Sequence, residues 1–298
     1  MMQFARRVAD AFTPQNAADR LSEALMDHLS TLLSLFGVRA SLFHSGEVCG
    51  VSTFAGDDQR GYLHLLRGGE LELKGPSGKR VLLTKPSLIF LPRPSRHQFF
   101  ASDNDVPTLL CASLEFAGGL DNPLAGSLPE MLVLPLDRLP MLADSLRWLF
   151  DEAAAQRCGR HAALDRLFEL IIIQLFRHLI DNGELSTGMM AGLADPRLAR
   201  SMEKIHNQPH QPWSVLDLAK ESNMSRASYA AFFKETVGQT PAEYLLSWRI
   251  SLAQRRLRQG RPIALIADEV GYDSPSALAR AFRRKTGVNP RDWVKSVE

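Results

Sequence analysis

Apolar positions change their spacing near residue 37. Residues 17–36 place apolar side chains at helical spacing, and Gly37 stands where such a helix would end. These apolar residues are Leu21, Leu25, Leu29, Leu32, Leu33 and Phe36. From Val38 to Phe116 the apolar residues form short runs between turn residues instead. The pattern predicts one amphipathic helix followed by an antiparallel sandwich or barrel of roughly 80 residues.

Helical spacing returns over residues 137–155 and 161–182. The second of these segments carries apolar residues on more than one face, so we expect it to be buried in its own chain or packed on a second copy in a homodimer. Residues 182–196 are rich in Gly and small polar residues and are the best linker candidate.

The last third of the chain repeats itself at an offset of 48–49 residues. Matched pairs are Leu218-Ala219 and Ile266-Ala267, Phe233 and Phe282, Gly238 and Gly287, Pro241 and Pro290, and Tyr244 and Trp293. Each copy predicts a short helix (215–221 and 263–270), a tight turn, and a second helix with a serine N-cap. Asn223 and Gly271 tolerate the positive φ of such a turn, and Pro275 suits a first helical position. Two helix-turn-helix units follow.

The second helix of a helix-turn-helix unit can lie in the major groove of DNA. We expect the contacts to come from Ser225, Arg226, Ala227, Ser228, Ala230, Ala231 and Lys234 in the first unit and from Ser274, Ser276, Ala277, Arg280, Arg283, Arg284 and Lys285 in the second. Alanine cannot hydrogen-bond a base, so Arg226 and Lys234 would hold phosphates, whereas Arg280 could make a bidentate contact to guanine. A strong helix over residues 242–259 would space the two reading helices about 34 Å apart. Arg249, Arg255, Arg256 and Arg258 would lie on its outer side.

Charge is divided unevenly along the chain. Its formal net charge is +2, but residues 1–194 hold 18 Lys+Arg and 22 Asp+Glu (net −4), while residues 195–298 hold 17 and 11 (net +6). A basic C-terminal third suggests a polyanionic partner. No 18-residue apolar run or secretory h-region is present, and three cysteines do not form a disulfide framework, so we expect a cytoplasmic protein that does not span a membrane.

The segment from Trp213 to Trp293 resembles the AraC/XylS family of bacterial transcriptional regulators. The likeness rests on both copies of the repeat and on the second-copy signature of Gly271-Tyr272, Phe282, Gly287 and Pro290. It implies binding to double-stranded promoter DNA, usually with activation of transcription, and RNA polymerase as a partner. Family members often carry larger polar residues where this chain has Ala227, Ala230 and Ala231. Readout by the first unit would therefore depend on DNA shape and phosphate contacts.

The N-terminal part, roughly residues 23–135, resembles the cupin-like sensor domain of a subgroup of this family. His64 and Glu70 are spaced like part of the first cupin metal motif and His97 like the histidine of the second, with His44 on a preceding strand. Leu66 stands where a further histidine is expected. The set suits Zn²⁺ or another divalent metal such as Fe²⁺ or Ni²⁺. An organic ligand in the barrel, or histidines with a structural role only, are the alternatives.

Cys49 and Cys111 lie in β-type segments of the same predicted barrel. Closeness within it would allow a reversible thiol switch that senses oxidants. The alternative is that each thiol is a small buried hydrophobe.

These observations predict a multidomain α+β protein, with an N-terminal cupin-like β-barrel plus helices and an all-α C-terminal domain with two helix-turn-helix motifs. The expected parts are a sensor domain with a leading helix (1–136), a helical coupling or dimerisation segment (137–184), a linker (185–194) and a DNA-binding domain (195–298). The predicted function is sequence-specific regulation of transcription, as an activator controlled by a small molecule, a metal or an oxidant. A metal-dependent cupin enzyme with an attached DNA-binding module is the alternative, and we expect no enzymatic activity.

Overall fold

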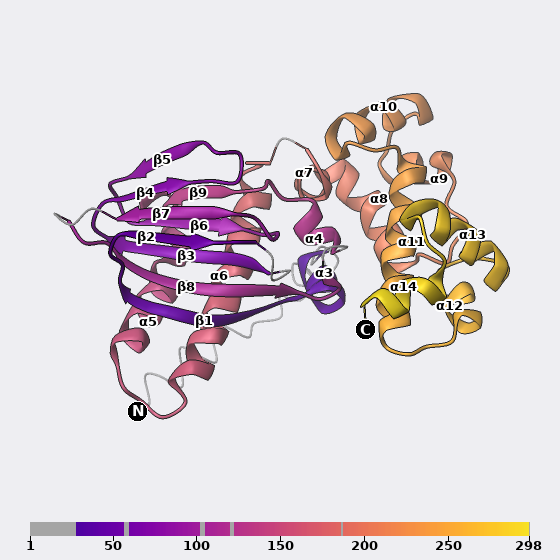
Figure 1. Ribbon diagram of the computed structural model, residues 1–298. Coiled ribbons are helices and arrows are strands. Elements are labelled where there is room, and N and C mark those ends of the chain that lie inside the picture. The colour runs from indigo at the N-terminus through magenta and orange to yellow at the C-terminus, as the bar shows by residue number, and fades with distance from the viewer. Residues whose placement is uncertain (1–27, 57–59, 102–104, 120–121, 186, 298) are drawn as a thin grey trace, which may run out of the picture.

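The structure is a computed structural model that describes residues 28–56, 60–101, 105–119, 122–185 and 187–297. A β-domain and a helical domain lie at opposite ends of the molecule, and three short helices occupy the junction between them (Figure 1). These helices are α3 (His28–Phe36), α4 (Pro123–Gly126) and α7 (Met189–Ala194). Helix α3 confirms the second half of the predicted leading helix, whose residues 17–27 lie outside the described residues.

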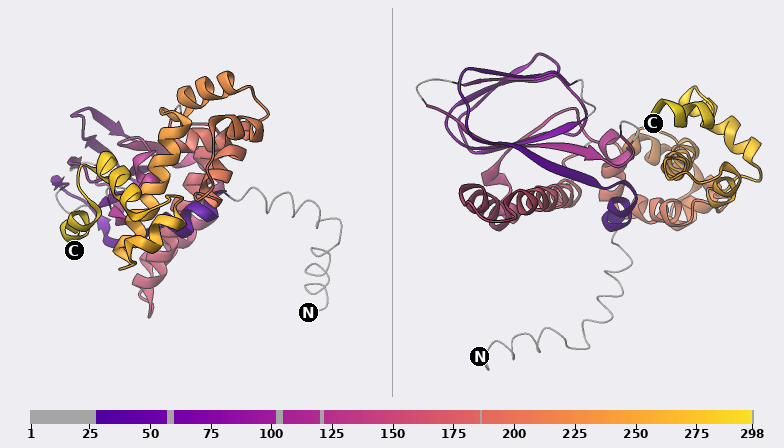
Figure 2. Two further views of the ribbon diagram at one scale, coloured as in Figure 1. Left: turned by 90° about the vertical axis from the view of Figure 1, so that its right-hand side faces the viewer. Right: turned by 60° about the horizontal axis from the view of Figure 1, so that its bottom comes forward.

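Two antiparallel sheets form the β-domain, as the sequence predicts, and the right-hand view of Figure 2 shows them curving around a common interior. The strands are β1 (Val38–Glu47), β2 (Val51–Phe54), β3 (Gly61–Gly68), β4 (Leu71–Lys74), β5 (Arg80–Leu83), β6 (Ser87–Leu91), β7 (His97–Ala101), β8 (Thr108–Phe116) and β9 (Leu132–Pro135). One sheet has the order β1-β8-β3-β6-β9 and the other β2-β7-β4-β5. Leu66, Leu73 and Phe99 belong to the apolar cluster formed by residues of both sheets.

Helices α5 (Ala143–Ala154) and α6 (Arg160–Asp181) pack against the five-stranded sheet. The Leu42 amide of edge strand β1 donates to Asp165 Oδ1 (2.9 Å), one helical turn from Glu169, which accepts from the Ala40 amide (3.4 Å). These contacts satisfy backbone donors that an open sheet edge would expose. Phe168 and Ile172 of α6 are fully buried within the chain, which is one of the two environments that the sequence left open.

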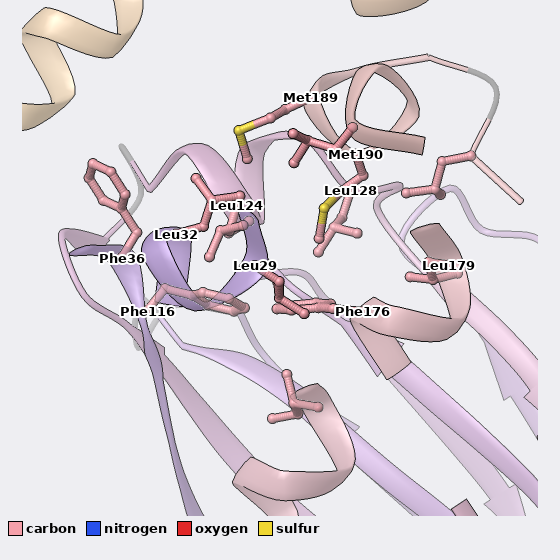
Figure 3. Packing of buried hydrophobic residues seen from close by; sticks show 14 of the residues in the cluster. Leu29, Leu32, Phe36, Phe116, Leu124, Leu128, Phe176, Leu179, Met189 and Met190 are labelled. Atoms are coloured by element: carbon pink, nitrogen blue, oxygen red, sulfur yellow. The ribbon is translucent and has the colours of Figure 1, made fainter. Parts of the chain in front are cut away.

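The predicted linker contains helix α7 rather than an extended connector. Five of its six residues are buried, and the helix contacts α6, α8 (Pro196–Asn207) and α10 (Arg226–Val237). Figure 3 shows Met189 and Met190 of α7 close to the leucines of α3 and α4. Burial of these apolar side chains favours an ordered segment, and it outweighs the conformational entropy that the Gly-rich chain loses when it is fixed.

The helical domain contains the two predicted repeats. Its further helices are α9 (Val215–Glu221), α11 (Pro241–Arg258), α12 (Ile263–Glu269), α13 (Pro275–Thr286) and α14 (Pro290–Val297). Helix α11 lies between the repeats, and its predicted inward residues Leu245, Trp248 and Leu257 are all buried. No helix in the described ranges is both long and apolar enough to cross a membrane.

Candidate DNA-binding surface and sensor cavity

The first helix-turn-helix unit is formed by α9 and α10. Asn223 in its turn has a φ of +53°, as the sequence predicts. The Ser228 amide donates to Ser225 Oγ (3.2 Å), which confirms the serine N-cap of α10. Tyr229 and Phe233 are fully buried and fix the helix against the domain, and burial raises the pKa of the Tyr229 phenol to about 12. Local capping and a buried aromatic face therefore set the orientation of α10.

The outer face of α10 is small, as the sequence predicts. Five predicted contact residues are exposed along with the capping Ser225, and Ala230 is half-buried. The exposed five are Arg226, Ala227, Ser228, Ala231 and Lys234. Phe232 is half-buried against the apolar core, and the Arg197 guanidinium covers its ring at 4.4 Å. Neither Arg226 nor Lys234 has an ion pair among the described residues, so both cations are available to phosphates.

The second unit, α12 and α13, repeats this construction. Gly271 turns with a φ of +79°, and the Ala277 amide donates to Ser274 Oγ (3.2 Å) at the N-cap. Pro275 occupies the first turn of α13, as predicted. Leu278 and Phe282 are fully buried. The exposed predicted contacts are Ser276, Arg280, Arg283, Arg284 and Lys285, whereas Ser274 and Ala277 are half-buried.

His64 and His97 form a buried pair inside the β-domain, with Nε2 atoms 3.0 Å apart. His97 Nδ1 lies 3.0 Å from the Ser95 carbonyl oxygen, to which only an N–H can donate. His97 Nε2 is then the acceptor and His64 Nε2 the donor, which leaves His64 Nδ1 without a hydrogen. Burial lowers the pKa of His97, and lowers that of His64 well below its usual value with help from the neighbouring imidazoles. Both rings are therefore neutral at pH 7.

Only part of the predicted metal set comes together. His44 and His64 lie in register on either side of Cys111, and His44 Nε2 is buried with no partner among the described atoms. Glu70 lies in the turn between β3 and β4, where its amide donates to the Asp105 carbonyl. No group of three or more His, Cys, Asp or Glu side chains that could hold a metal ion occurs in the described part of the chain. Two histidines fall short of the three protein ligands that a zinc site normally has, so the residues do not fit a resident metal.

A cavity of about 340 Å³, the β-domain cavity, is separated from the histidine pair by two of its lining residues, Phe54 and Phe99, whose rings contact His97 and His64. Its walls include Phe43, Phe54 and Phe99, and both Cys49 and Cys111 line it. The structure thus brings the two predicted redox cysteines to one cavity. Cys49 is exposed, whereas burial raises the pKa of the Cys111 thiol strongly and disfavours its reactive thiolate.

Comparisons with known proteins agree with this arrangement. A family model described as Cupin matches residues 27–181, more than half of the chain, and one described as Helix-turn-helix domain matches residues 218–296. Two proteins named "Putative AraC-like transcription regulator", from Streptomyces antibioticus and Streptomyces lividans, are each 36% identical over 65% of this chain. The chain belongs to the AraC-type family of transcriptional regulators, with an N-terminal cupin domain.

The matched region spans 66% of the length of each Streptomyces relative. The Escherichia coli K12 protein named "RCS-specific HTH-type transcriptional activator RclR" is 28% identical over 78% of this chain and 84% of its own length. Among solved structures, fatty-acid-bound ToxT from Vibrio cholerae is 14% identical, with a TM-score of 0.38 over 87% of this chain and 94% of that one. The DNA-bound domain of AdpA is 28% identical, with a TM-score of 0.32 over 34% and 92%.

In this AraC-type chain, four arginines of α11, the linking helix between the two units, contact other parts of the protein. Arg249 donates to the carbonyl oxygens of Pro209 and Gln211, both at 2.8 Å. Arg255 donates to the Ser34 carbonyl of α3 (3.3 Å), and Arg256 pairs with Glu269. The Arg258 guanidinium covers the ring of Trp293 at 4.5 Å. The expectation that these arginines lie on the outer side was wrong for Arg249, Arg255 and Arg256, which are half-buried against partners elsewhere in the chain. Arg258 is exposed, as expected.

Proposed function

We propose that this chain is a sequence-specific DNA-binding regulator that activates transcription in response to a signal in its β-domain. The observation that carries the proposal is the presence of two serine-capped helices, α10 and α13, with exposed cationic faces in equivalent positions of a repeat. The net charge of +6 over residues 195–298 supports a polyanionic partner.

The two units divide the recognition of DNA between them. Arg280, exposed on α13, reads guanine through a bidentate contact, while Arg283, Arg284 and Lys285 near the end of that helix hold phosphates. The small face of α10 binds the DNA phosphate backbone through Arg226 and Lys234, and its contribution to specificity comes from DNA shape.

A small organic molecule is the signal that the β-domain cavity supports best. Three phenylalanines line its walls, and His44, Glu47 and Ser52 add polar groups, of which His44 Nε2 has no partner among the described atoms. An oxidant is a second candidate, since the exposed Cys49 thiol and the buried Cys111 thiol share the same cavity. A metal signal would require a third ligand beside His64 and His97 from outside the described residues.

We further propose RNA polymerase as a partner, a homodimer as the working form, and the cytoplasm as the place of action. The homodimer is supported by exposed Trp148 on α5, which presents a large apolar side chain to solvent. A metal-dependent cupin enzyme is the competing function, and its support is the His64–His97 pair alone. Metal analysis and turnover assays on the full chain separate an enzyme from a sensor.

The proposed function is tested by selection of bound sequences from a random DNA library with the full chain, followed by gel-shift titration at moderate salt. We expect one enriched motif, bound at least about a thousandfold more tightly than random DNA. Equal affinity for the selected and random duplexes would remove the proposal.

A further inference from the structure

A second cavity, the interdomain cavity, lies between the β-domain and the helical domain and has a volume of about 300 Å³. Asn122 and Ser127, at the ends of α4, line one side, and Trp248 and Ser251 of α11 line the other. Met189 of α7 and Gln239, just after α10, are among the other residues that line it. None of these residues lines the β-domain cavity, so the two spaces are separate.

Among the residues that the structure describes, none that lines the interdomain cavity is charged. A charged ligand would lose its hydration there without gaining a counter-charge. Ser247, Ser251 and Gln239 carry hydroxyl and amide groups, while Met189 and Val237 are apolar. The Ser247 hydroxyl already lies at hydrogen-bond distance from Gln239 Oε1 (3.3 Å) and the Glu243 carbonyl oxygen (2.8 Å). This mixture suits an uncharged molecule with one polar group, and the volume, at the small end of ligand sites, suits about one ring.

One buried donor in this lining has no acceptor. Trp248 is 2% exposed, and its indole N–H finds no partner within the part of the chain that the structure describes. The Trp248 ring is held by His206, with centroids 4.1 Å apart, and by Phe36 at 5.2 Å. A buried donor without an acceptor costs about 1–3 kcal/mol, so a ligand oxygen that accepts from it would be favoured.

The opposite wall is already fixed. The Asn122 amide donates to the carbonyl oxygens of Phe36 (3.0 Å) and Ala117 (2.8 Å), and Asn122 Oδ1 accepts from the Leu124 and Ala125 amides. All four hydrogen-bonding positions commonly used by this side chain are satisfied. The cavity therefore has one preformed wall at α4, in the junction, and one wall in α11.

We infer that the interdomain cavity is a second small-molecule site, for an uncharged single-ring compound with a hydroxyl or carbonyl oxygen. A ligand there contacts both α4 and α11, so it stabilises the arrangement in which the two domains are joined. Its effect on DNA binding rests on the proposed function, whereas its binding to the protein does not.

The test uses the full chain without DNA and three probes of one size: benzyl alcohol, toluene and benzoate. Ligand-observed NMR and calorimetry should show benzyl alcohol binding about tenfold more tightly than toluene, which lacks the oxygen, and than benzoate, which is charged. Trp248→Phe, which removes the indole N–H, should abolish the preference for benzyl alcohol over toluene. No binding of benzyl alcohol to the wild-type chain would overturn the inference.

A matched pair of variants locates the site. Ser251→Leu fills the interdomain cavity and should lower the affinity for benzyl alcohol by about tenfold. Ser52→Leu, at a half-buried serine of the β-domain cavity, should change that affinity by less than about twofold. The opposite pattern would move the site to the β-domain and overturn the inference. Circular dichroism of each variant confirms folding, and Gly126→Leu, on the other wall, repeats the test without touching α11. If benzyl alcohol binds the protein but leaves its affinity for the selected DNA unchanged, the site stands and only its regulatory role is overturned.

Discussion

The ring of Phe36 meets the indole of Trp248 edge to face, with centroids 5.2 Å apart and planes at 65°. Phe36 ends α3, and Trp248 lies in the middle of α11, 212 positions further along the chain. Each is 2% exposed. Apolar contact of this kind joins the β-domain to the helical domain more firmly than a free linker could.

Phe36→Ala should lower the free energy of unfolding by about 3–5 kcal/mol, because it empties a fully buried aromatic site. It should also separate the unfolding of the two domains, so that calorimetry shows two transitions. Phe43→Ala, at a 48% exposed phenylalanine of the β-domain, is the matched control and should cost less. Equal losses for both variants would show that the junction does not depend on Phe36.

Arg280→Ala should weaken binding to the selected DNA by about 1–3 kcal/mol and relax the sequence preference at one base pair, because it removes a base contact. Lys234→Ala should weaken all duplexes alike and reduce the salt slope by roughly one. Gel-shift titrations at several salt concentrations measure both effects, with exposed Arg147→Ala of α5 as control. The assignment fails if both variants lose the same affinity on selected and random DNA.

Gly192→Ala should destabilise the chain although alanine favours helices. A Cβ at Gly192 would lie 2.6 Å from Met202 Sδ and 2.9 Å from Val237 Cγ2, so the buried Met202 and Val237 side chains or α7 itself would have to shift. Gly126→Ala is the control: it is also helical and has open space around its Cβ. We expect a lower melting temperature for Gly192→Ala only, and an increase for both would show that α7 is loosely packed.

Acid should destabilise the β-domain. The pKa values of His64 and His97 are lowered in the folded chain. Below about pH 6.5, both histidines are therefore protonated in the unfolded chain but still neutral in the folded chain. Stability is therefore complete above that pH and falls as the pH drops toward the folded pKa values. The double variant His64→Phe/His97→Leu should melt with a weaker pH dependence than wild type, while exposed His161→Gln should keep the wild-type dependence. An unchanged slope in the double variant would contradict the neutral pair.

The two turn residues should respond differently to substitution. Gly271→Ala should cost stability, because φ is +79° and its Cβ would lie 2.6 Å from the His210 carbonyl oxygen. Asn223→Gly, at the equivalent turn with a φ of +53°, should be close to neutral, since glycine adopts that conformation freely. Urea unfolding measures both changes. A cost for Asn223→Gly as large as that for Gly271→Ala would argue against the backbone explanation.

The sequence predicted most fully the features that depend on neighbouring residues. The serine caps at Ser225 and Ser274 and the left-handed turn residues are confirmed, because a cap or turn is formed within three or four positions. The range of α9 is confirmed residue for residue, and α12 ends one residue earlier than predicted. The repeat itself required only the comparison of two segments.

Features that depend on contacts between residues distant in the chain were not predicted from the sequence. Arg249 looked like a free cation, but its partners lie on a loop 38 and 40 positions away. Segment 185–194 looked like a linker because it is rich in Gly and small polar residues. Its few apolar residues form no amphipathic period long enough to predict where they pack. A sequence signal for α7 did exist in the adjacent Met189 and Met190, within an otherwise small and polar stretch.

The sequence by itself thus determined two capped helix-turn-helix units and an antiparallel β-domain, since these follow from local periodicity, caps and turns. Only the tertiary structure decided that His64 and His97 pair while Glu70 stays apart, that the cysteines share one cavity, and that residues of α4, α7 and α11 line another. Side chains far apart in the chain meet only where the packing of whole elements brings them, and no short segment encodes that distance.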